Sequence, residues 1–323
     1  MLRYTNLYKN IYLVKEESKR TNVLNSILIE SEKKSSSILI DANYSFSHID
    51  ELYTRVKPPA LALILSHFHT DHTAHAFYHE KKYNTPLYGP VQEENYFLSL
   101  NSIMENVGFS KLGPQIKENY LFFANEIMKF EECEEIRTFN PNGEILEFST
   151  VNLETIHIPG HSPGHTAFII KSENNGQARD ILYASDIGSH PYYGDMISDL
   201  KQYKESIDKL EKIYLSDDYM LIPSHGTTYL EKDKEFFKRI RQRIEKNEMM
   251  VLNALDKSKP KSIKQLVEEH IMTPKERIYP EIKELYYLWD GGMIFQHLKE
   301  FMEKGVVEKV EEKDFLNSKY ILI

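Results

Sequence analysis

Ser66-His67-Phe68-His69-Thr70-Asp71-His72 directly follows the apolar run from Ala60 to Leu65. A leucine-rich run that begins after two prolines is typical of a buried strand, so the histidine-rich stretch is expected to form the loop at its carboxyl end. Three imidazoles and one carboxylate lie within six positions of this loop. Zinc prefers nitrogen and oxygen ligands of these kinds, and the stretch therefore predicts a metal site at the end of the strand.

The spacing of these side chains favours two ions over one. Residues two apart in an extended loop point the same way, so His67 and His69 are expected to hold one ion between them. Asp71 and His72 point in a second direction, which suits a second ion better than a fourth bond to the first. A single histidine is usually a surface or core residue, but four such groups in six positions are hard to explain without a metal.

The composition is that of an ordinary globular protein, and 323 residues suffice for two domains or for one domain with appendages. Cys133 is the only cysteine, which excludes an internal disulfide and a multi-thiolate metal site. The amino terminus lacks the apolar core of a signal peptide, and no apolar run approaches membrane-spanning length. We therefore expect a cytoplasmic protein with no membrane partner. The net charge of −9 gives no support to a polyanion-binding surface.

Alternating β-rich and helix-forming runs predict a layered α/β fold. Polar turns separate the strands, and apolar side chains at helical spacing mark the helices. The predicted strands are 11–14, 26–30, 36–41, 60–65, 86–89, 145–148, 151–158, 166–170, 181–184 and 220–222. The predicted helices between them are 49–57, 73–83 and 197–214.

Residues from about 92 to 137 interrupt this alternation with apolar side chains at broadly helical spacing, which predicts an acidic helical insertion. One interpretation is a helical pair that packs on the core. A second interpretation, compatible with the first, is that Phe97, Phe109, Phe122 or Phe123 lines the metal pocket.

Three later motifs also follow predicted strands and carry candidate ligands. They are G-H-S-P-G-H at 160–165, S-D-I-G at 185–188 and P-S-H-G at 223–226. Combined with H-x-H-x-D-H at 67–72, they resemble the metallo-β-lactamase superfamily over about residues 10–228. The resemblance implies that residues 1–228 form a catalytic domain with an αββα sandwich.

The resemblance also implies how the ligands divide between two metal ions. It assigns His67, His69 and His161 to one ion, Asp71, His72 and His225 to the other, and Asp186 as the bridge between them. The complete histidine set looks like the glyoxalase II branch, whereas the flavodiiron branch has a glutamate at the position of His69. Hydrolysis is therefore favoured over oxygen reduction.

Some residues depart from the family pattern or do not match its ligand positions. Thr73-Ala74-His75 stands where the family often has two glycines. His157 and His165 are interpreted as outer partners of ligands or as packing residues, since a ligating imidazole usually donates its other nitrogen to such a partner. Ser162 and Ser224 are interpreted as turn residues. His75, His79 and His190 are not expected to be ligands.

The implied cofactor is a pair of zinc ions per chain, with iron or manganese as alternatives. A water shared by two zinc ions has its pKa lowered toward ~7, which supplies hydroxide without a strong side-chain base. We therefore predict a di-zinc hydrolase that uses a metal-bridging hydroxide on a small ester, thioester or lactone. Asp71 is the predicted catalytic residue, which would orient the water or return a proton to the leaving group. The alternative is a metal-dependent endoribonuclease or phosphodiesterase.

Residues 229–323 are predicted to form a helical, winged-helix-like domain similar to the appendage of lactamase-like hydrolases and endoribonucleases. The predicted elements are helices at 230–255, 262–271, 280–288 and 290–304, a linker at 257–261, and a hairpin of 306–309 with 319–322. Residues 257–323 carry twelve basic and twelve acidic side chains, which is a poor basis for phosphate binding. We expect packing or a homodimer contact here; a small-molecule substrate is favoured, and a nucleic-acid partner is possible but not favoured.

Overall fold

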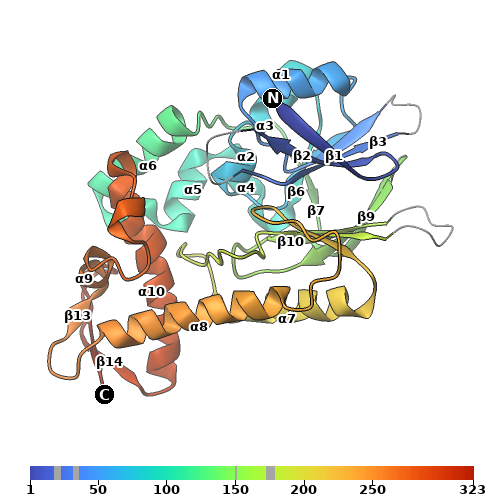
Figure 1. Cartoon of the computed structure of the whole chain (residues 1–323). Helices are drawn as coiled ribbons and strands as arrows, with labels where there is room; N and C mark the ends of the chain where they lie inside the picture. Colours follow the sequence, from blue (N-terminus) through green and yellow to red (C-terminus); the bar gives the residue numbers. More distant parts are fainter. Residues whose placement is uncertain (18–22, 32–35, 150, 172–178) are drawn as a thin grey trace.

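Two β-sheets lie face to face and helices cover both outer faces, so the chain forms the αββα sandwich expected from the sequence (Figure 1). The computed structural model describes residues 1–17, 23–31, 36–149, 151–171 and 179–323. Helices α1 (Phe46–Arg55) and α3 (Ala76–Tyr83) pack on the first sheet. Helices α7 (Leu200–Ser216) and α8 (Phe236–Ala254) run along the second.

The first sheet contains β1 (Leu2–Tyr8), β2 (Ile11–Glu16), β3 (Ser26–Glu30), β4 (Ser37–Ile40), β5 (Ala62–Ile64), β6 (Leu87–Pro90) and β7 (Arg137–Phe139), in that order. The first four strands pair antiparallel, and β4 to β7 pair parallel. The sequence did not predict β1 or β7. Only Leu2 of β1 and Phe139 of β7 are fully buried, so neither strand has the apolar run or alternation that indicates a strand in the sequence.

The second sheet contains β8 (Asn142–Phe148), β9 (Val151–His157), β10 (Thr166–Ile170), β11 (Ile181–Ser185) and β12 (Met220–Pro223). Its strand order is β12-β11-β10-β9-β8, and only the β11–β12 pair is parallel. These bounds lie within three residues of the predicted ones.

Alternate side chains of the strands enter different cores, because successive residues of a strand point to opposite faces. In β3, Ile27 and Ile29 pack between the two sheets, whereas Leu28 packs under the outer helices. In β11, Tyr183 packs between the sheets and Leu182 packs under α7. Both faces of these strands are buried, which explains why the sequence shows continuous apolar runs there.

The segments that carry the candidate ligands meet at one edge of the sandwich. The main-chain N–H of Thr166 donates to the carbonyl of Ser66 over 3.0 Å, which joins the start of β10 to the loop after β5. The hydroxyl of Ser185 at the end of β11 lies 2.7 Å from that of Ser66. Because β11 and β12 are parallel, their carboxyl ends reach the same edge.

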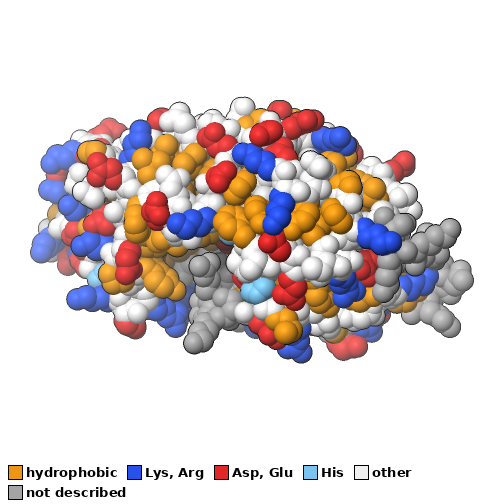
Figure 2. All heavy atoms as spheres, turned by 90° about the horizontal axis from the view of Figure 1, so that it is seen from above, with side chains coloured by type: hydrophobic (Ala, Val, Ile, Leu, Met, Phe, Trp, Pro, Cys, Tyr) orange, Lys and Arg blue, Asp and Glu red, His pale blue; other side chains and the backbone are white. Residues whose placement is uncertain are grey.

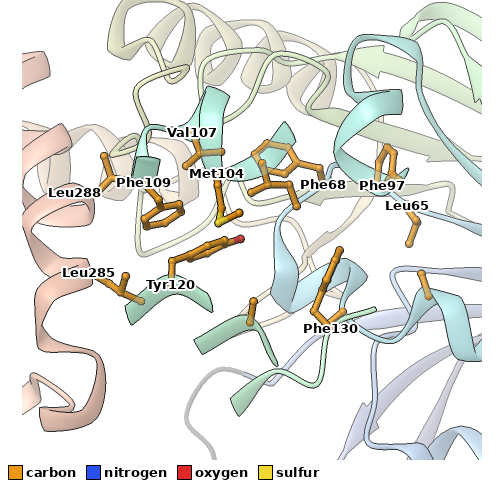
Figure 3. Packing of buried hydrophobic residues seen from close by; sticks show 14 of the residues in the cluster. Leu65, Phe68, Phe97, Met104, Val107, Phe109, Tyr120, Phe130, Leu285 and Leu288 are labelled. Carbon is orange, nitrogen blue, oxygen red and sulfur yellow. The ribbon is translucent and has the colours of Figure 1, made fainter. Parts of the chain in front are cut away.

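Residues 91–127 form the expected helical insertion, which lies between β6 and β7. Its elements are η1 (Val91–Glu93), α4 (Glu94–Leu98), α5 (Leu100–Val107), η2 (Phe109–Leu112), α6 (Pro114–Phe122) and the π-helical η3 (Phe123–Ile127). The rings of Phe109 and Tyr120 stack with centroids 3.8 Å apart. Figure 3 shows this pair next to Leu285 and Leu288, so the insertion packs on the C-terminal region as well as on the sandwich.

After α8, the chain forms β13 (Lys261–Ser262), α9 (Ile263–Glu268), η4 (Lys275–Arg277), η5 (Pro280–Leu285), α10 (Tyr286–Glu303), β14 (Val307–Glu311) and β15 (Lys319–Leu322). The predicted hairpin is present, and β13 adds a third strand in the order β13-β15-β14. The similarity to a winged helix and the boundary at residue 228 stay predictions.

Three predicted bounds in this region were wrong. The long helix begins at Phe236 and not at residue 230, and the expected helix 280–288 is a 3₁₀ segment up to Leu285 that leads directly into α10. The expected linker ends inside β13, because Lys261 pairs with Tyr320. No helix among the described residues combines the length and the apolar character needed to cross a bilayer.

Candidate metal centre

The seven side chains proposed as ligands lie in two adjacent groups. His67, His69, His161 and Asp186 form one group, and Asp71, His72 and His225 form the other. Within each group, one ligand atom per residue lies within 4.8 Å of all the others. Four separate loops supply these residues, and Asp71 and His72 lie on the short helix α2 (Thr70–Thr73), which begins directly after His69.

Three imidazole nitrogens converge in the first group. Nε2 of His67 lies 3.1 Å from Nδ1 of His69 and 3.1 Å from Nε2 of His161. Two nitrogen ligands of one tetrahedral zinc ion would be separated by about 3.3 Å, as follows from Zn–N bonds of about 2.0–2.1 Å. His67 and His161 are fully buried, and His69 is largely so.

The second group has buried nitrogens that lack a hydrogen bond. Neither ring nitrogen of His72 or of His225 makes one with any described residue. Carboxylate oxygens do lie close, with Oδ2 of Asp71 3.2 Å from Nε2 of His225, but not in directions that make a hydrogen bond. A buried polar atom without a partner is costly, and an ion that accepts the lone pair would remove that cost.

Asp186 lies between the two groups and presents one oxygen to each. Its Oδ2 lies 3.3 Å from Nε2 of His161, and its Oδ1 lies 3.0 Å from Nε2 of His72. The hydroxyl of Ser224 donates to Oδ1. This placement is the one that a bridging carboxylate requires.

Asp195 and Tyr192 support the first group from a loop that the sequence did not single out. Nε2 of His69 donates to Oδ2 of Asp195 over 2.7 Å, and the hydroxyl of Tyr192 donates to Oδ1 of the same carboxylate over 2.6 Å. Nδ1 of His161 donates to the carbonyl of Tyr192. Each imidazole thus has its outer nitrogen held while the other faces the group, which is the usual arrangement of ligating histidines.

Helix α10 of the C-terminal region lies directly against this loop. A Cβ atom at Gly292 would lie 1.6 Å from the carbonyl oxygen of Gly194, so only glycine allows the helix to approach so closely. The C-terminal region therefore buttresses the loop that carries Tyr192 and Asp195.

Asp41 gives the second group a comparable support. Its carboxylate accepts hydrogen bonds from the main chain and hydroxyl of Ser66 and from the hydroxyl of Tyr183. Oδ2 of Asp41 also lies 3.0 Å from Nδ1 of His72. Asp41 is fully buried, and its position after β4 places it beside the loop that follows β5.

Glu93, at the start of the insertion, joins the two loops that carry His67, His69 and His161. Its Oε2 accepts from the main-chain N–H of Phe68 over 2.7 Å. Its Oε1 accepts from the hydroxyl of Ser162 and from the main-chain N–H of Gly164. Burial raises the pKa of Glu93 to about 7, and these hydrogen bonds act against that rise.

The charged groups of the centre shift one another's pKa. Burial acts to raise the pKa of Asp186, but His72 and His225 outweigh it and hold that pKa well below its usual range. Burial lowers the pKa of His67 well below its ordinary value, and the nearby His72 adds to the effect. An ionised carboxylate and a neutral imidazole are the states that bind metal.

The remaining histidines lie outside the two groups. Nε2 of His165 accepts from the main-chain N–H of Asp186 over 3.1 Å, and its Nδ1 donates to the carbonyl of Ile158. His157 contacts the carbonyl of Pro163, and His79 is buried against Tyr53 and Ala42. The turn interpretation of Ser162 and Ser224 was incomplete, because their hydroxyls bind Glu93 and Asp186.

A pocket of about 1180 Å³ opens over the two groups. Its lining comes from the metal loops, from the insertion, and from the C-terminal region, which the sequence did not indicate. Phe109, Phe122 and Phe123 line it as expected. Phe97 does not, because it packs in the core against Gly89, where a Cβ atom would lie 2.6 Å from the phenyl ring.

Comparisons with known proteins agree with this geometry. Residues 21–225 match the family model described as the metallo-beta-lactamase superfamily. The chain is 25% identical over 211 residues to hydroxyacylglutathione hydrolase GloC of Haemophilus influenzae, which covers 63% of this chain and 85% of that protein.

Two solved structures resemble almost the whole chain. A beta-lactamase domain protein from Burkholderia ambifaria has a TM-score of 0.71 at 16% identity and covers 99% of this chain and 93% of its own. A metallo-beta-lactamase family protein from Thermus thermophilus has a TM-score of 0.71 at 15% identity and covers 98% of this chain and 100% of its own. At such identities they show a shared fold, which extends through the C-terminal region.

Proposed function

The chain belongs to the metallo-β-lactamase superfamily, and from this premise we propose that it is a di-zinc hydrolase of a small ester, thioester or lactone. The proposal rests on one observation: two converging ligand groups lie at the base of a pocket with an apolar wall. His67, His69 and His161 would hold one ion, Asp71, His72 and His225 the other, and Asp186 would bridge them. Iron or manganese would suit the same ligands.

Bound ions would supply a hydroxide at neutral pH and polarise the carbonyl oxygen of the substrate. The chain's own residues would hold this centre in place. Asp195 would fix the ring of His69, Asp41 would stand behind His72, and Glu93 would hold both loops of the first group. Ligands held in this way need little rearrangement during the reaction.

Asp71 is the side chain we assign to proton handling. It lines the pocket next to Asp186 and His225, where it could orient the attacking water. With a thioester substrate, the hydroxide formed from water adds to the acyl carbon. The C–S bond then breaks, and sulfur leaves with the bonding electron pair. The proton from water passes through the Asp71 carboxylate to that sulfur. The products are one carboxylic acid and one thiol.

The wall formed by the insertion would bind the acyl chain. Ile103, Val107 and Phe109 of the insertion line the pocket, and so do Trp289 and Met293 of α10. The rings of Phe123 and Trp289 are in contact, with centroids 5.7 Å apart. Apolar area of this kind stabilises a bound alkyl chain by up to about 0.8 kcal/mol per buried methylene.

The test is a series of acyl thioesters of one thiol, from acetyl to decanoyl, on zinc-loaded protein. We expect kcat/KM to rise with chain length by up to about fourfold per methylene until the pocket is filled. Phe123→Ala should flatten the rise. Leu121→Ala is the control, because Leu121 belongs to the same insertion but does not line the pocket. A flat series from wild type, together with cleavage of an RNA oligomer, would favour the phosphodiesterase alternative.

A further inference from the structure

Three cationic side chains also line the pocket. We call this set the cationic wall. It consists of Arg243 and Lys246 of α8 and Arg277 of η4, all of which line the pocket. Lys246, Asn247 and Met250 follow Arg243 by three, four and seven positions, so the four residues lie on one face of α8. Two segments that are distant in sequence thus bring three cations to one cavity.

These cations differ from their neighbours on the same helix. Arg239 pairs with Asp233, and Arg241 pairs with Asp208 and Glu211. Arg243, Lys246 and Arg277 have no carboxylate within ion-pairing distance anywhere in the described chain. Guanidinium groups form paired hydrogen bonds with carboxylates and phosphates, so two that are left unpaired in a pocket are suited to a ligand of that kind.

The acids that line the same pocket form no ion pair with the cationic wall. Asp290 accepts hydrogen bonds from the main chain and hydroxyl of Thr273, which occupy both of its oxygens. Glu281 is exposed and forms no ion pair with a described residue. The carboxylates of Asp71, Asp186 and Asp195 belong to the metal centre and its support.

The cationic wall shares its pocket with the second ligand group, because Asp71 and His225 line that pocket too. His190 lines the same pocket, and after burial the groups that lower its pKa are Arg243, Arg277 and His225. The two guanidinium groups thus face the same pocket as His190 and His225. The aromatic side chains of the insertion line the same pocket, so a substrate bound at the metal centre would have apolar and cationic neighbours.

We propose that the cationic wall binds an anionic group, carboxylate or phosphate, on the leaving-group side of the substrate. This rests on the proposed function, in which the acyl chain occupies the aromatic part of the pocket. The preferred substrate is then an acyl thioester or ester whose thiol or alcohol carries a negative charge.

A small anion fits this wall better than a nucleic acid does. The three cations line a single pocket, and the chain carries a net charge of −9. Figure 2 shows acidic and basic side chains intermixed over one face of the molecule, with no extended basic surface there. Nucleic-acid binding depends on neutralising many phosphates at once, which requires such a surface.

The experiment compares one acyl group on three thiols with zinc-loaded protein. The thiols are uncharged N-acetylcysteamine, 3-mercaptopropionate with a carboxylate, and phosphopantetheine with a phosphate. We expect wild type to favour at least one anionic thioester by about tenfold or more in kcat/KM, as a charge-assisted contact would give. The double variant Arg243→Gln, Arg277→Gln should reduce that preference to about one. Arg241→Gln is the matched control and should keep it.

Three results would overturn the proposal. Wild type could show no preference for a charged thiol, the double variant could keep the preference, or an RNA oligomer could be cleaved in a salt-dependent way that the double variant loses. If wild type hydrolyses no thioester at all, the proposed function fails. In that case the anion-binding role of the cationic wall is tested by measuring the equilibrium binding of the free thiols. The proposal requires that 3-mercaptopropionate bind wild type more tightly than N-acetylcysteamine does, and that the double variant lose that difference.

Discussion

Oδ2 of Asp195 lies 2.7 Å from Nε2 of His69, on the opposite side of the ring from the nitrogen that faces His67. Burial acts to lower the pKa of His69, but the carboxylates around it, with Asp195 first among them, outweigh burial and raise that pKa. A carboxylate in this position fixes the tautomer of a ligating imidazole and makes its other nitrogen more basic.

We therefore predict that Asp195→Asn lowers the affinity for zinc about 10- to 100-fold, since the substitution keeps the shape but removes the charge. Competition with a chromogenic chelator measures this affinity. Asp208→Asn, which changes an exposed carboxylate paired with Arg241, is the control. Equal zinc affinity in Asp195→Asn and wild type would show that this carboxylate does not support the metal centre.

The purified, metal-loaded protein should hold about two first-row metal ions per chain, because two ligand groups lie side by side. Elemental analysis of protein dialysed against excess zinc gives the ratio. Saturation at one ion would contradict the assignment of Asp71, His72 and His225 to a second site.

Asp186→Asn should weaken both sites together, because each oxygen of Asp186 faces one ligand group. His161→Ala should weaken mainly the first site. His165→Ala should retain most of the metal and lose thermal stability instead, since His165 holds the main chain of Asp186 and not an ion. Stoichiometry and melting temperature of the three variants separate these outcomes. Metal loss from His165→Ala as large as that from His161→Ala would contradict the assignment of His161, and not His165, as the ligand in the G-H-S-P-G-H motif.

Asp290 should make stability depend on pH. Its folded-state pKa is raised from 3.8 to about 6, mainly by burial, so the folded state binds a proton more tightly than the unfolded state does. The resulting stabilisation is fully present below about pH 4 and is lost as pH rises through about 6. The effect is on the order of 2 to 3 kcal/mol.

The measurement is the free energy of unfolding of wild type and of Asp290→Asn between pH 4 and 7. Metal loss at low pH affects both proteins, so their difference isolates Asp290. Wild type should lose stability relative to the variant as pH rises across this range. A constant difference would show that Asp290 keeps a nearly normal pKa.

The chain's own residues were enough to predict a layered α/β fold and candidate ligands at strand ends, whereas the αββα sandwich and the division of the ligands between two sites were implied by the resemblance to the superfamily. Strands buried on both faces, such as β3 and β11, carry continuous apolar runs that mark them in the sequence. The histidine and aspartate motifs directly follow such strands, so local patterning already places them at strand ends. Edge strand β1 escaped prediction because only Leu2 among its side chains is fully buried.

Only the tertiary structure decided which residues support the two ligand groups and which residues line the pocket above them. Asp195 is 126 residues from His69, and Glu93 reaches Gly164 across 71 residues. The sequence around a single acidic residue in a loop or at the start of a helix does not indicate which distant residue it will contact. Arg243 and Arg277 likewise meet in the pocket only because α8 and the C-terminal region fold back over the metal loops. Periodicity records which face of an element is buried, but not which distant polar group it will meet, because that depends on how whole elements pack.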